Sequence, residues 1–234
     1  MTTKNILHRF FPNVFRDGSI PPGKCSFDHL TEPDMASHLN ITKYNDFLLT
    51  DAIRPSYDLQ VVPGQGCRYD AFRDEERGIS VPVLMASVTR KHLFETFMEL
   101  LDPLGAVVDV VLETSHEQRW VGHTDLYREG IDLPVLKSIL WDFEEMLTHD
   151  GCTGLAVLSR DEPVEIQFDE HKLLMVYGER LDRFETILDE CGVARDDEIR
   201  FLTEAEHVHA SNDALASKFE SLTARLGMDV NDAF

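Results

Sequence analysis

The stretch TGLAVLSRDEPVEIQFDEHKLLMVYG, residues 153–178, decides the fold class. It contains three apolar runs joined by short polar connections, and Val164, Ile166 and Phe168 alternate with polar or charged residues. An alternation with a period of two predicts strands that keep one face in water. Connections this short join antiparallel neighbours, because parallel neighbours need a crossover of a dozen residues or more. The stretch therefore predicts a three-stranded antiparallel meander.

Apolar periodicity predicts the elements on either side of the meander. Strands are expected at 79–87, 106–114 and 198–209, and helices at 90–105, 132–151, 180–192 and 211–227. The order strand–helix–strand–helix–strand–strand–strand–helix–strand–helix mixes crossovers with hairpins. We therefore predict an α+β fold, with a mixed sheet of about six strands and with its helices packed on one side.

Residues 1–78 differ from the rest of the chain, because proline and glycine interrupt them repeatedly. This pattern predicts an irregular N-terminal arm broken by short elements. Its apolar residues, among them Phe10, Phe11 and Phe15, argue against a free tail. We expect residues 1–78 to form an arm that wraps its own core or contacts a second subunit, and residues 79–234 to form the α+β core domain with a C-terminal helix.

The charge of the chain restricts its partners. It carries 43 Asp and Glu against 22 Lys and Arg, a formal net charge of −21. Nucleic acids and anionic lipids are bound largely through Lys and Arg, so we expect neither a nucleic-acid nor a membrane partner. The carboxylates are dispersed, which also disfavours a mimic of nucleic acid that would need them in a row on one face.

The cysteines and the N-terminus predict a cytoplasmic protein. Four cysteines lie far apart with no CxxC spacing, as is typical of reduced thiols. The first residues lack the features of a secretory signal, and no run approaches the roughly 20 apolar residues of a membrane span. The glycine-rich VVPGQGCR at 61–68 lacks the residues of a phosphate-binding loop, so no nucleotide cofactor is expected.

The spacing most suggestive of chemistry is EAEHVHASND at 204–213, where His207 and His209 are separated by one residue. Side chains two apart on a strand share a face, at roughly 6.5 to 7 Å. Two imidazoles in this arrangement can hold one Zn²⁺ or another divalent metal if further ligands arrive from elsewhere. The alternative is a polar pair at the end of a strand, with Glu204 and Glu206 nearby.

The further ligands would come from ETSHEQRWVGHTD at 113–125, which offers Glu113, His116 and His123. A metal-dependent hydrolase is one functional hypothesis for this combination. The metal would lower the pKa of a bound water, and a carboxylate among Glu113, Glu117 and Asp125 would accept its proton. This hypothesis requires the segment 113–125 to meet His207 in the folded chain.

The leading hypothesis is a binding protein without enzymatic activity. The loop expected at 114–130 carries Arg119, Trp120, Tyr127 and Arg128, and aromatic and arginine side chains concentrate binding energy at protein interfaces. The chain has no nucleophile elbow and no HExxH motif. We therefore expect a protein partner or self-association through this loop and the N-terminal arm. The sequence leaves open whether the protein is an enzyme.

Overall fold

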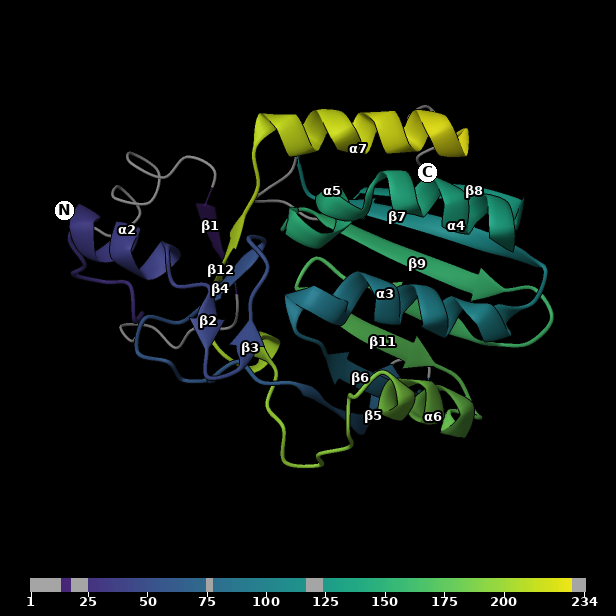
Figure 1. The fold of residues 1–234 in the computed structure, drawn as a ribbon, viewed down its shortest axis with the longest axis horizontal. Helices are drawn as coiled ribbons and strands as arrows, with labels where there is room; N and C mark the ends of the chain where they lie inside the picture. Colours follow the sequence, from purple (N-terminus) through teal and green to yellow (C-terminus); the bar gives the residue numbers. More distant parts are fainter. Residues whose placement is uncertain (1–13, 18–24, 75–77, 117–123, 229–234) are drawn as a thin grey trace.

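The computed structural model describes residues 14–17, 25–74, 78–116 and 124–228 of the chain (Figure 1). The predicted α+β class is confirmed, since a large antiparallel sheet carries a layer of helices. The order of strands in this sheet is β5-β6-β11-β10-β9-β7-β8. Their bounds are β5 Gly66–Asp74, β6 Ile79–Ser87, β7 Val107–Thr114, β8 Thr124–Asp132, β9 Thr153–Ser159, β10 Glu165–Phe168 and β11 Leu173–Tyr177.

The predicted meander forms the middle of the large sheet. β10 pairs antiparallel with β9 on one side and with β11 on the other, and Ile166 lies between Val157 and Val176. Val164, Ile166 and Phe168 are buried, while Glu165 and Gln167 are half-buried on the opposite face. The alternation in the sequence thus matches the two faces of the sheet.

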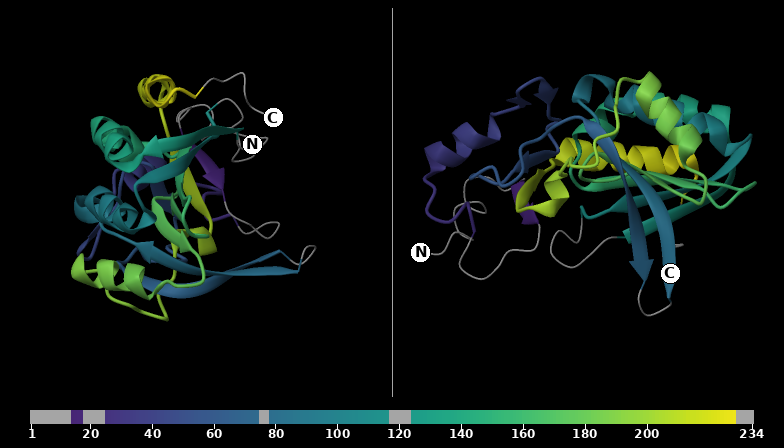
Figure 2. Two further views of the ribbon diagram at one scale, coloured as in Figure 1. Left: turned by 90° about the vertical axis from the view of Figure 1, so that its right-hand side faces the viewer. Right: turned by 90° about the horizontal axis from the view of Figure 1, so that it is seen from below.

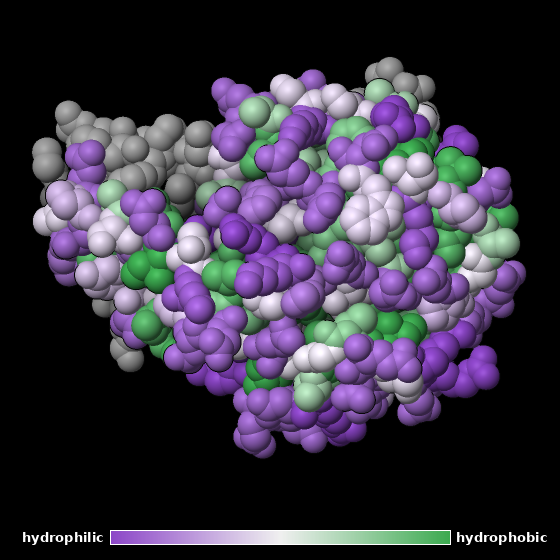
Figure 3. All heavy atoms as spheres, in the orientation of Figure 1, coloured by the Kyte–Doolittle hydropathy of each residue, from purple (hydrophilic) through white to green (hydrophobic). Residues whose placement is uncertain are grey.

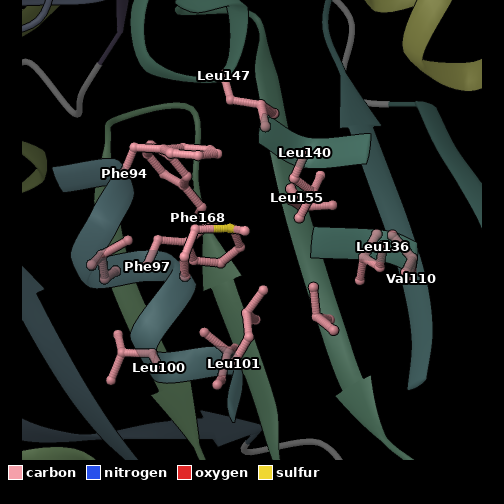
Figure 4. Close-up of a cluster of buried hydrophobic side chains, with 14 of the residues drawn as sticks. Phe94, Phe97, Leu100, Leu101, Val110, Leu136, Leu140, Leu147, Leu155 and Phe168 are labelled. Carbon is pink, nitrogen blue, oxygen red and sulfur yellow. The ribbon is translucent and has the colours of Figure 1, made fainter. Parts of the chain in front are cut away.

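Helices cover one face of the sheet, as Figure 2 shows in its left view, with α3, α4 and α6 on the same side. Their bounds are α3 Arg90–Leu101, α4 Leu133–Asp142, α5 Glu144–His149, α6 Asp182–Glu190 and α7 Asp213–Leu226. The main core lies between these layers (Figure 4), where Phe97 of α3 meets Phe168 of β10 with ring centroids 5.2 Å apart. Each fully buried Phe of this kind contributes about 3 kcal/mol of hydrophobic stabilisation at most.

Several boundaries differ from the sequence-based expectation. The helix expected at 132–151 is two helices, because the backbone at Phe143 turns to φ −118°, outside the helical range. The strand expected at 198–209 is reduced to β12 (His207–Ala210), preceded by the short 3₁₀ helix Leu202–Glu204. β5 and β8, at the two edges of the large sheet, were not predicted as strands.

A smaller sheet adjoins the large one. It contains β12 in the centre, with β1 (Val14–Asp17) and β4 (Ile53–Pro55) on its two sides. The helix α2 (Glu32–Leu39) and the hairpin of β2 (Lys43–Tyr44) and β3 (Phe47–Leu48) complete this part of the molecule. The last strand of the chain thus pairs with strands from the N-terminal 78 residues, whereas β5, from the same range, belongs to the large sheet.

Polar side chains dominate the face drawn in Figure 3, in keeping with the high content of charged residues. In the described part of the chain, no helix combines the length and the apolar character that crossing a bilayer requires.

Candidate metal centre

β12 lies beside the end of the large sheet at which β9 and β11 begin (Figure 1). β7 and β10 end there because they run antiparallel to β9. The turns and strand ends at this edge bring side chains from distant parts of the sequence toward β12. All the histidine contacts described below lie in this region.

His207 and His209 point to the same side of β12, as their spacing predicts. Both are buried, with 2% and 0% of their surface exposed. The Nδ1 of His207 donates to the carbonyl oxygen of Ala205 at 2.8 Å, and the Nδ1 of His209 donates to that of Gly151 at 2.9 Å. A carbonyl oxygen only accepts hydrogen bonds, so the proton of each neutral ring is on Nδ1 and the lone pair is on Nε2.

The two Nε2 atoms face each other at 3.1 Å. Two lone pairs at this distance repel unless a proton or a cation lies between them. Two nitrogens bound to one zinc ion at 2.0–2.1 Å in tetrahedral geometry are about 3.3 Å apart. The observed separation is therefore close to the one that a shared zinc ion would impose.

His171 is the third imidazole of the group. It lies in the turn between β10 and β11, and its ring centroid is 5.0 Å from that of His207 and 4.8 Å from that of His209. The centroids of His207 and His209 are also 5.0 Å apart, so the three rings form a nearly equilateral triangle. One ligand nitrogen from each ring lies within 4.8 Å of the other two. His171 is the ring nearest to solvent, with 18% of its side chain exposed.

Asp169 builds the turn that presents His171. Its Oδ1 accepts the backbone N–H of Leu173 at 2.8 Å, and its Oδ2 accepts the Nδ1–H of His171 at 2.7 Å. Burial alone would raise the pKa of Asp169, but the His171 ring, the Leu173 N–H and Lys172 hold that pKa below its ordinary value. All three imidazoles of the group therefore have Nδ1 bound to an oxygen acceptor, which leaves Nε2 as the ligand atom.

Lys172 introduces a buried cation next to this turn. Its backbone has φ +64°, an uncommon conformation for a residue with a side chain, and only 5% of its surface is exposed. Its Nζ donates to the carbonyl of Thr153 at 2.9 Å and lies 5.2 Å from the centre of the Phe168 ring. Burial lowers the pKa of Lys172, while Asp150, Asp169 and Glu170 act in the opposite direction. Lys172 thus ties the turn to the start of β9.

A second group of potential ligands consists of His116, Asp150 and Cys152. One ligand atom from each lies within 4.8 Å of the other two. Asp150 is fully buried, and its Oδ2 accepts His116 Nε2–H at 2.8 Å and the Thr153 hydroxyl at 2.6 Å. Burial acts to raise the pKa of Asp150, but His116 and Thr153 bring it to about 2. For His116, burial opposes protonation, yet Asp150 and Cys152 raise its pKa to about 9.

Gly151 connects the two groups. Its carbonyl oxygen accepts the Nδ1–H of His209, and its neighbours in sequence are Asp150 and Cys152 of the second group. Its N–H donates to the carbonyl of Ala210 at 2.9 Å. A Cβ at this position would lie 2.8 Å from the Ala210 oxygen and would also meet the carbonyl of Ala52. The close approach of these backbones explains the absence of a side chain.

The structure separates the metal ligands proposed from the sequence. His207 and His209 lie together with His171, which sequence reasoning missed, whereas His116 belongs to the second group. His123 and Glu117 lie outside the described residues. Glu113 is at the end of β7, and a methyl group built on Gly154 would lie 3.0 Å from its Oε2 and 3.7 Å from the N atom of Glu170. Among the described residues, Glu113 is in neither ligand group.

Of the proposed partner-binding residues, Arg119 and Trp120 lie outside the described residues. Tyr127 and Arg128 are not in a loop, as expected, but on the edge strand β8, where both are exposed. Tyr127 exposes 59% of its surface, and its hydroxyl donates to Asp125 at 3.3 Å. These two side chains are therefore accessible from the edge of the sheet.

The sequence does contain a signal for the residues that were missed. Asp169-x-His171 stands in the short connection between β10 and β11, where a carboxylate can orient an imidazole within one turn. Asp150-Gly-Cys152 stands between a helix and a buried strand. Both signals are weak without knowledge of which turns face β12.

Comparisons with protein family models, with curated proteins and with solved structures find no match to this chain.

Proposed function

We propose that this protein binds a divalent metal ion, with Zn²⁺ as the first candidate, through Nε2 of His171, His207 and His209. The observation that carries the proposal is the 3.1 Å separation of the Nε2 atoms of His207 and His209, with both Nδ1 atoms bonded to carbonyl oxygens. The sequence-based hypothesis of a metal site at His207 and His209 is kept, with His171 replacing the ligands expected from residues 113–125.

A proton shared between the Nε2 atoms of His207 and His209 would explain why these two atoms lie close together, but not why the ring of His171 lies beside them. It requires an imidazolium ion in a place where both rings are at most 2% exposed, and burial disfavours the charged form of an imidazole. A metal ion accounts for the convergence of three rings and for the three oxygen acceptors behind them. Ligating histidines almost always donate their other N–H to a carbonyl or a carboxylate, which fixes the tautomer and orients the ring.

The number of ligands favours a catalytic centre. Structural zinc sites have four protein ligands, whereas catalytic sites have three and keep a position for water or substrate. Three imidazoles on zinc lower the pKa of a bound water to ~7. We therefore propose a metal-dependent hydrolase. Glu113 and Glu170, which both border Gly154 at this end of the sheet, are the proposed proton acceptors.

Metal analysis of the purified full-length protein tests the proposed centre. We expect the wild type to bind zinc stoichiometrically, and His171→Ala and His207→Ala to lose this ion. His92→Ala, which removes an exposed histidine on α3, is the matched control and should keep the metal. Circular dichroism confirms that each variant is folded. Equal metal content in His207→Ala and in the control would overturn the proposal.

Hydrolysis is tested separately with the zinc-loaded protein and with 4-nitrophenyl esters and phosphate esters as probes. The proposal predicts turnover that His171→Ala abolishes and that Glu113→Gln or Glu170→Gln reduces. Zinc binding without turnover of either probe class in the wild type would count against a hydrolase and leave the metal centre in place.

Protein binding stays a second proposal because of Tyr127 and Arg128. An exposed aromatic residue and an exposed arginine follow each other on an edge strand, and such strands offer unpaired backbone groups to a partner. Replacing both residues with alanine should change the oligomeric state in light scattering or the partners captured in a pull-down. If neither measurement changed, this role would be contradicted.

The cytoplasm is the proposed location, since the four cysteines are thiols and not disulfides.

A further inference from the structure

We propose that the pocket between α2 and the turn at residues 56–59 binds a small, neutral aromatic carboxamide. The pocket has a volume of about 360 Å³, which is in the range of sites that hold small molecules. It lies in the part of the molecule that contains α2 and β2, on the left of Figure 1. It shares no residue with the three-histidine centre, and the proposal does not depend on that centre.

One face of α2 forms the first wall of the pocket. Asp34, His38 and Ile41 follow each other at intervals of four and three residues, so they share a face of the helix, and all three line the pocket. Ile41 comes just after the helix, and its N–H donates to the His38 carbonyl at 3.0 Å. The face of the helix thus continues past its last residue.

The turn that follows β4 forms the second wall. The N–H of Leu59 donates to the Ser56 carbonyl at 3.0 Å, and the N–H of Tyr57 donates to the Ser26 hydroxyl at 2.9 Å. These bonds fix the backbone from which Tyr57 and Leu59 reach the pocket. The rings of Tyr57 and His38 have their centroids 5.5 Å apart, so the two walls are in contact.

Both walls present exposed apolar surface. Ile41, Tyr57 and Leu59 expose 42%, 43% and 40% of their surfaces, although all three are large hydrophobic residues. Apolar residues that gather at one exposed place mark a binding site more often than single exposed ones do. An aromatic ring in this pocket would cover Ile41 and Leu59 and would pack against the ring of Tyr57.

The hydroxyl of Tyr44 supplies a second, independent observation. Tyr44 lines the pocket and is 9% exposed, and its hydroxyl is buried without a hydrogen-bond partner among the described residues. A buried polar atom without a partner costs on the order of a lost hydrogen bond, so native proteins rarely leave one. Burial raises the pKa of Tyr44, although Arg54 acts in the opposite direction. The hydroxyl therefore keeps its proton, and a carbonyl oxygen of a ligand would accept it.

His38 supplies the complementary acceptor. Its Nε2–H donates to the Pro55 carbonyl at 2.9 Å, and burial lowers its pKa, although the bond to Pro55 acts in the opposite direction. The neutral ring therefore has its lone pair on Nδ1. A ligand that satisfies both Tyr44 and His38 needs one acceptor and one donor. A primary carboxamide has both, in its carbonyl oxygen and its N–H groups.

The charges around the pocket favour a neutral ligand. Among the described residues that line it, none is Lys or Arg, so no cation faces a ligand carboxylate. Arg54, which is near Tyr44, donates to the backbone carbonyls of Leu39, Thr50 and Ile53. The carboxylate of Asp34 is exposed to water, which weakens its attraction for an ammonium group.

Calorimetric titration of the full-length protein with benzamide tests the site. We expect benzamide to bind more tightly than benzoate and benzylamine, which have the same ring but carry a charge. Tyr44→Phe keeps the ring in its apolar cluster and removes only the hydroxyl, so it should weaken benzamide binding roughly 5-fold. Tyr69→Phe is the matched control and should bind benzamide as the wild type does, because the Tyr69 hydroxyl donates to Glu185 outside the pocket.

Thermal unfolding gives a second readout. Without ligand, Tyr44→Phe should unfold at or above the temperature of the wild type, because it removes a buried group that has no partner. Added benzamide should raise the unfolding temperature of the wild type more than that of Tyr44→Phe. A free Tyr44→Phe that is less stable than the wild type would overturn the proposal, because the hydroxyl would then have a partner in the free protein.

The titrations can overturn the proposal in three further ways. These are no binding of benzamide to the wild type, equal affinity of the wild type and Tyr44→Phe for benzamide, and binding of benzoate or benzylamine as tight as that of benzamide.

Discussion

Asp169 serves the turn and the candidate metal centre at once. One carboxylate oxygen closes the β10–β11 connection by accepting the Leu173 N–H, and the other holds Nδ1 of His171. The first contact is available to any residue that caps a turn, but the second orients an imidazole whose ring lies against His207 and His209. The geometry of His171 therefore depends on a residue that would not itself bind the metal.

Replacing Asp169 with asparagine should weaken zinc binding without removing it. The amide keeps the size and one acceptor, but it lacks the charge that strengthens the bond to His171. Loss of such an outer hydrogen bond typically costs 10- to 100-fold in metal affinity. Zinc titration against a competing chelator measures the change. Asp189→Asn, on the exposed side of α6, should bind zinc as the wild type does, and equal affinity in the two variants would contradict the assigned role.

His38 predicts a pH dependence of stability away from the candidate centre. It is 4% exposed on α2, lies between the rings of Phe27 and Tyr57, and donates from Nε2 to the Pro55 carbonyl at 2.9 Å. Burial lowers its pKa in the folded state, although the bond to Pro55 acts in the opposite direction. Between this lowered pKa and ~6.5, the unfolded chain binds more protons than the folded chain, so stability falls as the pH falls.

The variant His38→Gln should lose this contribution while keeping an N–H donor for Pro55. From pH 7.5 to 5.5, the wild type should therefore lose more unfolding free energy than the variant, by at most about 1.4 kcal/mol per pH unit. Urea denaturation at the two pH values gives the comparison. His92→Gln, an exposed histidine, should follow the wild type. Parallel pH profiles for His38→Gln and the wild type would show that His38 does not titrate differently on folding.

Among the elements, the edges of the large sheet were the hardest to predict. β9, β10 and β11 lie in its middle and have apolar residues at regular spacing, because helices cover one of their faces. β5 and β8 lie at the edges and carry charged side chains such as Arg68, Asp70, Arg128 and Glu129. An edge strand buries less surface and often carries charges that prevent further pairing. Its pattern in the sequence is correspondingly weak.

The turn between α5 and β9 should not tolerate a side chain at Gly151. A Cβ there would meet backbone atoms of Ala52 and Ala210, which cannot rotate away as a side chain can. We expect Gly151→Ala to cost roughly 1–3 kcal/mol of unfolding free energy. It should also weaken zinc binding, because the Gly151 carbonyl holds His209. Chemical denaturation and zinc titration measure the two effects.

Gly64→Ala is the control for that substitution. No atom lies within 4 Å of a Cβ built at Gly64, and its φ is not positive, so its stability should stay within about 0.5 kcal/mol of the wild type. If Gly151→Ala had the same free energy of unfolding and the same zinc affinity as Gly64→Ala, the close approach of the backbones at Gly151 would not affect either quantity.

At the scale of the whole molecule, the candidate centre joins its two parts. His207 and His209 belong to the small sheet with β1 and β4, whereas His171 belongs to a hairpin of the large sheet. The three imidazoles meet only in the folded chain, so a metal ion bound to all three would bind the folded state and not the unfolded one. Binding restricted to the folded state stabilises it by mass action.

Zinc should therefore raise the unfolding temperature of the protein. At a free zinc concentration 100 times the dissociation constant, the stabilisation is about 2.7 kcal/mol. Thermal unfolding in the presence of a chelator and of added zinc measures the shift. His207→Ala should show a reduced response, while His92→Ala should respond as the wild type does. A chelator without effect on the wild type would contradict metal binding in the folded state.

The sequence by itself determined the α+β class, the central meander and the shared face of His207 and His209. Each of these follows from the spacing of residues within one element, which the periodicity of helix and strand dictates locally. Only the tertiary structure decided that His171 is the third imidazole beside His207 and His209, that His116 lies with Asp150 and Cys152, and that β12 belongs to the small sheet and not to the large one. These contacts join segments far apart in the chain, and their formation depends on which strand ends and turns pack together. The spacing of residues within one segment does not specify that packing.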